Sequence, residues 1–251
     1  MKKRGQSSIF IIAGIVIVIV AVLIVFFTRE DIQVGGRITS TQVEPIREYI
    51  GDCIKERLES DLKTRRRLGG RESLDFSARE PLSKYNVLNR PFNNLPSLYT
   101  IEQGISRDIK DYIKSNGCSL NDFRNNFVIS EQRDIVDAQL NISDSGNIIN
   151  LVVTYPVIIE KGDFKTELDT FNVILEDDFG RIHSIINDIL NGAAEDARIN
   201  IADYCQSSDV ICSVVENNGG LRLVQIGNRE DFPPAGEQGK PGDVFIFVIA
   251  P

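Results

Sequence analysis

The chain has 251 residues, a formal net charge of −8 and 42% hydrophobic residues, which is enough apolar material for a folded core. An acidic chain is a poor nucleic-acid binder, because binding relies on a basic surface to neutralise phosphates. We therefore expect no nucleic-acid partner, and we expect the acidity to keep an exposed domain soluble.

An unbroken apolar run of 19 residues, from Ile9 to Phe27, follows the basic start MKKR. As a helix it would be about 28 Å long, close to the ~30 Å hydrocarbon core of a bilayer. Basic residues precede the run, whereas Arg29, just after it, is followed at once by Glu30 and Asp31. The positive-inside rule then predicts a single-pass protein of the cell membrane with its C-terminal domain outside.

A cleaved secretory signal is the alternative for this start. Such a signal has an apolar region of about 7–15 residues that ends in a small-x-small cleavage site. The apolar run is longer here, and the sequence after it, FFTREDIQVGG, has no such site. We therefore favour a retained helix.

The segment KKRGQSS before the apolar run resembles the class III signal of archaeal type IV pilins and archaellins. This resemblance implies that a prepilin-type peptidase cuts between Gly5 and Gln6, leaving residues 1–5 as a leader and 6–30 as a transmembrane or filament-core helix. Gln6 and Ser8 match the family's Gln-x-Ser pattern. The family usually has Glu at the fifth mature position, where this chain has Phe10, and that Glu is thought to register subunits in filaments. The resemblance thus favours processing more strongly than polymerisation.

The order of the later pieces is similar to that of a group of uncharacterised archaeal membrane-anchored surface proteins. The shared features are a basic-Gly-Gln-apolar start, a helix with YIGDC, a later helix that ends near a cysteine, and a hairpin with YPVIIEKGD. This second resemblance implies the order of the helices and strands but no catalytic or binding residues.

Three helices are predicted after a polar linker at 31–42. Apolar residues at spacings of three and four predict the first over STQVEPIREYIGDCIKERLESDLKTRRR, ended by Gly69 and Gly70. The second is predicted over about residues 95–116, and the third over RIHSIINDILNGAAEDARINIADY.

Strands are predicted where apolar residues occur at every second position. IVDAQLNIS and NIINLVVTYPVIIEK flank the turn DSGN, and FKTELDTFNVILEDD follows, which predicts a three-stranded antiparallel meander. Short strands VICSVVE, LRLVQIG and VFIFVIA are expected near the C-terminus, with the loop EDFPPAGEQGKPGD as a mobile or interaction segment. The fold class is therefore α+β, with one N-terminal stem helix before an extracellular domain over 43–251 in which amphipathic helices pack on an antiparallel sheet.

Four cysteines are expected in an oxidising exterior and allow three pairings. We favour Cys53 with Cys118, which would join the first two helices, and Cys205 with Cys212, which would close a local loop. A zinc site formed by the cysteines with His183 is the functional alternative, but the cysteines are widely spaced and the sequence has no CxxC motif. Unpaired structural thiols are the third possibility.

Other candidate residues favour ordinary structural roles. His183, the sole histidine, is expected to be a surface or satisfied side chain. The acidic turn LEDDFG lacks the spacing of a calcium loop and is expected to be a solvated turn. The basic cluster TRRRLGGR is expected to be a solvated helix end, with contact to anionic lipid or an acidic neighbour subunit as the alternative. Asn141 begins an N-glycosylation sequon, Asn-Ile-Ser. No metal, no cofactor and no catalytic residue is predicted.

These features favour a pilin-like cell-surface protein with a structural or adhesive role. Its expected partners are the membrane, a prepilin-type peptidase, and further copies or other pilin-like subunits. The alternative is a monomeric anchored ectodomain that binds a ligand or a partner membrane protein. An anchored enzyme ranks third, because no catalytic motif is present.

Overall fold

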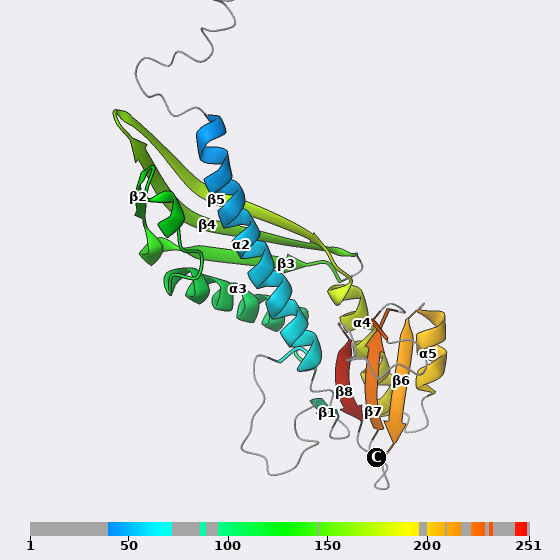
Figure 1. Ribbon diagram of the computed structural model, residues 1–251. Coiled ribbons are helices and arrows are strands. Elements are labelled where there is room, and N and C mark those ends of the chain that lie inside the picture. Colours follow the sequence, from blue (N-terminus) through cyan, green and yellow to red (C-terminus); the bar gives the residue numbers. More distant parts are fainter. Residues whose placement is uncertain are drawn as a thin grey trace, which may run out of the picture.

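The structure, a computed structural model, describes residues 40–71, 86–88, 95–144, 146–195, 200–208, 210–216, 222–228, 231–232 and 244–249. It has an α+β fold with a long first helix and two sheets (Figure 1). The elements are α2 (Ser40–Arg67), β1 (Asn86–Leu88), α3 (Leu98–Lys114), η2 (Asn121–Phe123), β2 (Val128–Glu131), η3 (Arg133–Ile135), β3 (Asp137–Ile142), β4 (Ile148–Lys161), β5 (Phe164–Glu176), α4 (Phe179–Glu195), α5 (Ile201–Ser207), β6 (Ile211–Glu216), β7 (Arg222–Gly227) and β8 (Phe245–Ile249).

The first helix, α2, covers the segment that the sequence predicts. Its apolar stripe is buried throughout: Val43, Ile46, Ile50, Ile54, Leu58 and Leu62. The helix ends in a Schellman cap, in which Gly70 N–H donates to Arg65 O at 2.7 Å and Gly69 N–H to Arg66 O at 3.1 Å. Gly69 and Gly70 have φ of 61° and 85°, which explains why glycines stand here. The predicted linker is shorter than expected, because the helix already includes residues 40–42.

The first sheet contains the predicted meander β3–β4–β5, and all of its strand pairs are antiparallel. The central strand is β4, and β5 pairs with one of its edges. Along the other edge β3 and β2 follow one another, so β2 extends the sheet beyond the meander. The register shifts between Thr154 and Val157, around Pro156, which has no N–H to donate to the ladder.

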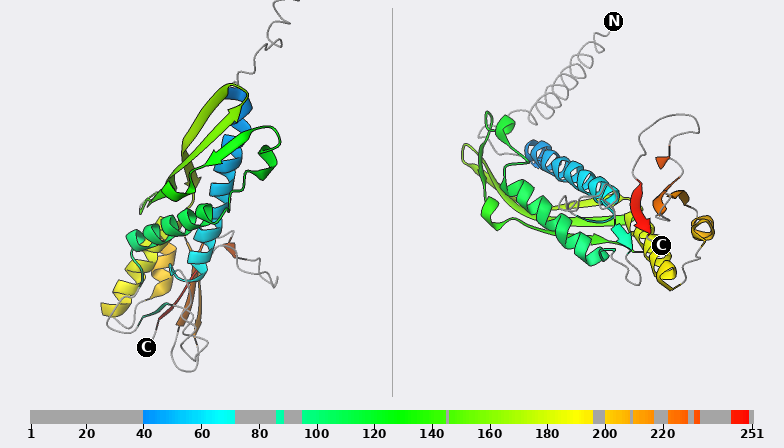
Figure 2. Two further views of the ribbon diagram at one scale, coloured as in Figure 1. Left: turned by 90° about the vertical axis from the view of Figure 1, so that its left-hand side faces the viewer. Right: turned by 90° about the horizontal axis from the view of Figure 1, so that it is seen from below.

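Two helices cover one face of this sheet. The α2 helix packs against β5 and α3 packs against β3, as Figures 1 and 2 show. The buried side chains alternate along β3 and along β4 up to the register shift. They meet the apolar stripes of the helices, which are formed in α3 by Ile101, Ile105, Ile109 and Ile113. The other face carries exposed residues, such as Gln139, Asn141 and Ile174.

The second sheet has the strand order β1-β8-β7-β6. Its strands are antiparallel except for β1, which pairs with β8 in parallel. Helix α4 packs against β7 and β8, and α5 packs against β6. The rings of Phe179 and Phe245 lie 4.8 Å apart between α4 and β8. The apolar residues of α4 and of this sheet thereby continue the core of the first sheet.

The predicted α+β class is confirmed, with two corrections to the layout. The described strands form two sheets instead of one, and they include a parallel pair. The predicted helix over 181–204 is two helices, because Asn200 begins α5 as an N-cap whose side chain accepts a hydrogen bond from Ala202 N–H. Most of the predicted loop over 230–243 lies outside the described residues.

Within the described ranges, no helix combines the length and the apolar character needed to cross a bilayer. The predicted leader at 1–5 and stem helix at 6–30 lie outside those ranges.

Candidate functional site

A polar cavity of about 300 Å³ lies where α2 ends, β5 passes into α4 and β7 ends. Its wall is rich in charged side chains and brings together residues far apart in sequence. The lining residues are Arg66, Asn147, Glu176, Asp177, Asp178, Asn228 and Asp231.

Arg66 is the centre of this cluster. Its guanidinium donates to Asp177 Oδ1 at 2.5 Å and to Asp178 Oδ1 at 2.8 Å, and lies 5.7 Å from the centroid of the Phe179 ring. The side chain is only 7% exposed, and its Nε is buried with no hydrogen-bond partner among the described residues. A buried arginine shared by two carboxylates joins the elements that carry them, because removing the guanidinium leaves two largely buried carboxylates with fewer partners.

Asp178 extends the cluster to the second sheet. Its Oδ2 accepts hydrogen bonds from Asn228 Nδ2 at 2.6 Å and from Arg181 at 3.3 Å. Arg181 also donates to Asn228 Oδ1 at 2.9 Å. One carboxylate thus joins the end of α2, the first turn of α4 and the end of β7.

This geometry overturns two expectations from the sequence. Arg65 and Arg66 are not a solvated helix end: both are buried, and Arg65 donates to Asp108 Oδ2 at 2.7 Å. Asp177 and Asp178 are not a solvated turn, since both pair with Arg66. Arg66 of the basic segment TRRRLGGR therefore binds both carboxylates of the acidic segment LEDDFG. No group of three or more metal-ligating side chains occurs in the described ranges.

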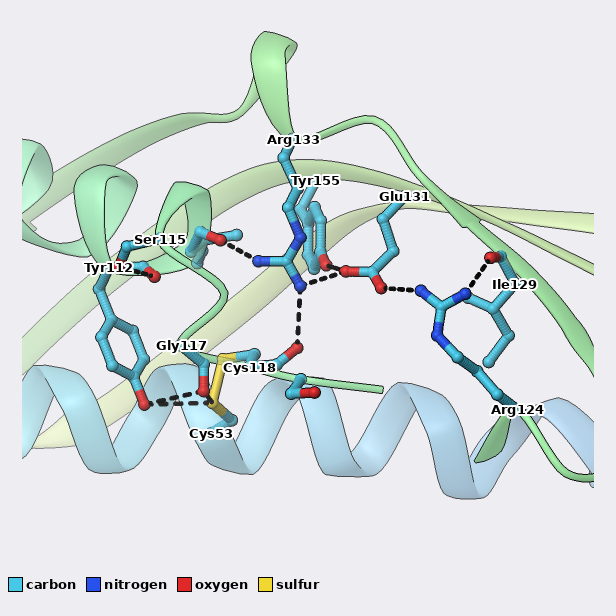
Figure 3. A network of polar contacts seen from close by, with 12 residues as sticks. Cys53, Tyr112, Ser115, Gly117, Cys118, Arg124, Ile129, Glu131, Arg133 and Tyr155 are labelled. Atoms are coloured by element: carbon cyan, nitrogen blue, oxygen red, sulfur yellow. Dashed lines mark hydrogen bonds and ion pairs between the residues drawn. A yellow bond between two sulfur atoms is a disulfide. The ribbon is translucent and has the colours of Figure 1, made fainter. Parts of the chain in front are cut away.

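A second polar network joins β2 to α3 next to the first disulfide (Figure 3). Arg133 donates to the carbonyl oxygen of Ile113 in the last turn of α3, to Cys118 O at 3.5 Å and to the Glu131 carboxylate. The free carbonyls at a helix C-terminus favour a cation. Arg133 thus fixes the end of α3 against the sheet.

Glu131 is the shared acceptor of this network. It accepts from Arg133 and from the Tyr155 hydroxyl, and Arg124 donates to its Oε1 at 2.7 Å. Burial and the hydrogen bond to Glu131 raise the pKa of Tyr155, so the phenol stays protonated at neutral pH. Because Glu131 is paired with two arginines and a phenol, the network has the features of a structural cluster and not of a reactive site.

Both disulfides have the pairing that the sequence favours. Cys53 of α2 is bonded to Cys118 just after α3, and Cys205 of α5 to Cys212 of β6. The first sits in a tight turn, where Asn116 has φ of 72° and a Cβ on Gly117 would lie 2.4 Å from the Tyr112 ring. The disulfides indicate an extracytoplasmic domain, because disulfides persist in oxidising compartments.

His183 is a satisfied, buried histidine, one of the two outcomes expected for it. Its Nε2 lies 2.7 Å from Pro96 O, which only accepts, so Nε2 carries the proton. Burial lowers the pKa of His183, and the neutral imidazole is the stable form. A cavity of about 530 Å³ lies beside it, between the residues before α3 and the exposed side of α4, with Asp144 and Ser184 in its wall. Within the described chain, the contact to Pro96 is the one polar contact of the imidazole.

Asn141 is exposed on β3, on the open face of the first sheet and opposite Asn150. The processing residues Gly5 and Gln6 lie outside the described ranges.

Sequence reasoning did not single out Glu131, Arg133 or Tyr155. The nearest signal is the short spacing of Arg124, Glu131 and Arg133, which alone does not distinguish a buried network from a solvated loop.

Comparison with known protein families, with curated proteins and with solved structures finds no match for this chain.

Proposed function

We propose that this chain is a pilin-like cell-surface protein with a structural or adhesive role. The apolar helix predicted over 6–30 would hold it in the membrane or in a filament core, and the α+β domain would be displayed outside. The observation that carries the proposal is the pair of disulfides, Cys53–Cys118 and Cys205–Cys212, in a domain that follows a long apolar segment.

The construction of the described domain supports this role. The charged side chains around Arg66 and around Glu131 form ion pairs with one another, and these pairs are suited to holding helices and strands together. Helix α2, which packs against β5, would connect the linker after the stem to the sheet. For α2 the 28 residues correspond to a length of about 42 Å.

N-terminal mass spectrometry of the protein purified from its native membrane tests the proposal. A mature chain that begins at Gln6 supports processing by a prepilin-type peptidase. A chain that begins at Met1 would contradict the pilin route and leave a plain signal anchor. A start after Thr28 would contradict membrane retention as well.

The alternative is a monomeric anchored ectodomain that binds a ligand or a partner membrane protein. The observation in its favour is the cavity beside His183, whose wall mixes apolar Leu95 and Leu98 with polar Ser184 and Asn187. Electron microscopy of the purified protein separates the two functions: filaments support the first, and small species that depend on detergent support the second.

A further inference from the structure

One end of the described domain gathers partly exposed aromatic and apolar side chains. The β4–β5 hairpin turns here at Gly162, with Lys161 and Phe164 on its two sides. Phe127 and Val128 lie alongside, because Val128 pairs with Glu160 and the Lys161 ammonium lies 5.2 Å from the centroid of the Phe127 ring. We call this surface the hairpin end and define it by Phe127, Val128, Lys161, Gly162 and Phe164.

The side chains of the hairpin end are only partly covered by the protein. Val128 is 64% exposed, although it is a β-branched apolar residue. Phe127 and Phe164 pack against the core with one side and are of intermediate exposure. Aromatic rings with one buried and one wet side are typical of residues at a membrane–water interface.

The hairpin end lies at the same end of the domain as the first turn of α2, as Figures 1 and 2 show in three views. The chain before α2 leads back to the apolar run that ends at Phe27, so residues 28–39 separate the two. Twelve residues span at most about 40 Å when fully extended. A stem retained in the bilayer therefore holds the first turn of α2 within about 40 Å of the end of the apolar run. The opposite end of α2 lies about 42 Å further along the helix axis.

The charges around the hairpin end are of both signs, since Lys161 and Lys165 stand beside Glu160 and Asp163. Lys165 lies 2.9 Å from Glu160, and Arg124 lies 2.7 Å from Glu131. A surface with charges of both signs and exposed apolar groups is suited to the interfacial region of a bilayer and does not depend on anionic headgroups.

We infer that the hairpin end rests on the lipid bilayer that holds the stem. Phe127, Val128 and Phe164 would enter the headgroup region, and α2 would direct the second sheet away from the membrane. This inference rests on the proposed function, since it requires the apolar run to be retained in a bilayer.

The chain contains no tryptophan, so a single introduced indole reports on one position. The test uses the full chain in phosphatidylcholine vesicles with lipids brominated near the headgroup as quenchers. The probe is Phe164→Trp, and the matched control is Tyr99→Trp. Tyr99 is 69% exposed at the start of α3, near the Pro96–His183 contact and away from the hairpin end.

We expect several-fold stronger quenching at position 164 than at position 99. Added salt should leave this quenching unchanged, because screening acts on charges and not on apolar contact. Adding Val128→Asp to the 164 probe should reduce the quenching, and because Val128 is exposed, this change leaves the core intact.

Equal quenching at the two positions, or none at 164 in protein that floats with the vesicles, would overturn the lipid contact and leave the anchor standing. Protein that does not float would overturn the anchor and the contact with it. A blue shift at 164 that grows with protein concentration, without quenching by brominated lipid, would assign the surface to a second copy of the chain and also overturn the inference.

Discussion

Replacing Arg66 by methionine tests whether the charged cluster holds the two sheets together. Methionine fills the space of the aliphatic stem of arginine and has no charge, so the change removes the shared cation of Asp177 and Asp178 and keeps the packing of that stem. The residue is 7% exposed, so water cannot readily take over the role of the guanidinium.

The expected loss in the free energy of unfolding depends on the hydrogen-bond partners that the two carboxylates keep. Removing one partner of a buried ion pair costs about 3–5 kcal/mol. Asp178 keeps Arg181 and Asn228, and Asp177 keeps the Phe179 N–H at 2.8 Å. The unpaired Nε of Arg66 also disappears, and with it a buried donor that costs about 1–3 kcal/mol. We therefore expect a net loss of roughly 2–3 kcal/mol in the free energy of unfolding.

The assay is urea unfolding of the full chain in detergent with its disulfides intact. A loss of that size lowers the urea midpoint by about 1 M at a slope of about 2–3 kcal/mol per molar. Arg67→Met is the matched control, since it is the same change one residue later at an exposed position and should stay within about 0.5 kcal/mol of the wild type. If Arg66→Met and Arg67→Met unfold at the same urea concentration, the assignment of Arg66 as the shared structural cation is wrong.

Three further predictions concern single sites. Burial lowers the pKa of His183, so the unfolded state binds a proton more readily than the folded state as the pH falls below about 6.5, and the free energy of unfolding should decrease there. His183→Gln keeps a donor for Pro96 O and should unfold with a weaker pH dependence between pH 7.5 and 5. An unchanged pH dependence would contradict the assignment of His183 as a buried neutral histidine. Replacing both cysteines of Cys53–Cys118 by alanine should cost about 4 kcal/mol in urea unfolding, against about 2.4 kcal/mol for Cys205–Cys212, since the pairs are separated by 65 and 7 residues; a larger loss for the second pair would refute the loop-length argument. Asn141 should carry a glycan in protein from the native source, seen as a mass shift of its peptide that Asn141→Gln removes, and an unmodified peptide would show that the sequon is not used.

Much of the first sheet and its helices is predictable from local pattern. The stripe from Val43 to Leu62 has the period of a helix, and the paired glycines at 69 and 70 mark its end because they accept positive φ. The turn DSGN between two alternating segments likewise predicts β3 and β4. These features depend on neighbours within a few residues, so the sequence contains the information needed to place them.

The charged clusters and the second sheet depend on contacts that no local pattern specifies. Arg66 contacts Asp177 and Asp178 across 111 and 112 residues, and its position in the basic last turn of a helix is typical of solvated charge. The parallel pair β1–β8 joins segments more than 150 residues apart. Which charges become buried is decided by how the elements pack, and one sequence does not contain that information in a local form.

Helix α2 is tied to the rest of the domain at three levels along its length. Near its start, Tyr49 donates to Ser119 O at 3.1 Å and its ring meets Phe123 edge-on. One turn later the Cys53–Cys118 disulfide bonds it covalently to the end of α3.

At its end Arg65 pairs with Asp108 of α3, and Arg66 pairs with the turn that leads into α4. A load that enters through the N-terminal end of α2 is thus passed first to the loop after α3, then through a covalent bond, and then to both sheets. For a filament stem or for a membrane anchor the requirement is the same: the helix that receives the load must not peel from the domain it carries. The disulfide lies between the two non-covalent attachments, so peeling that starts at Tyr49 must break a covalent bond before it reaches the ion pairs of Arg65 and Arg66.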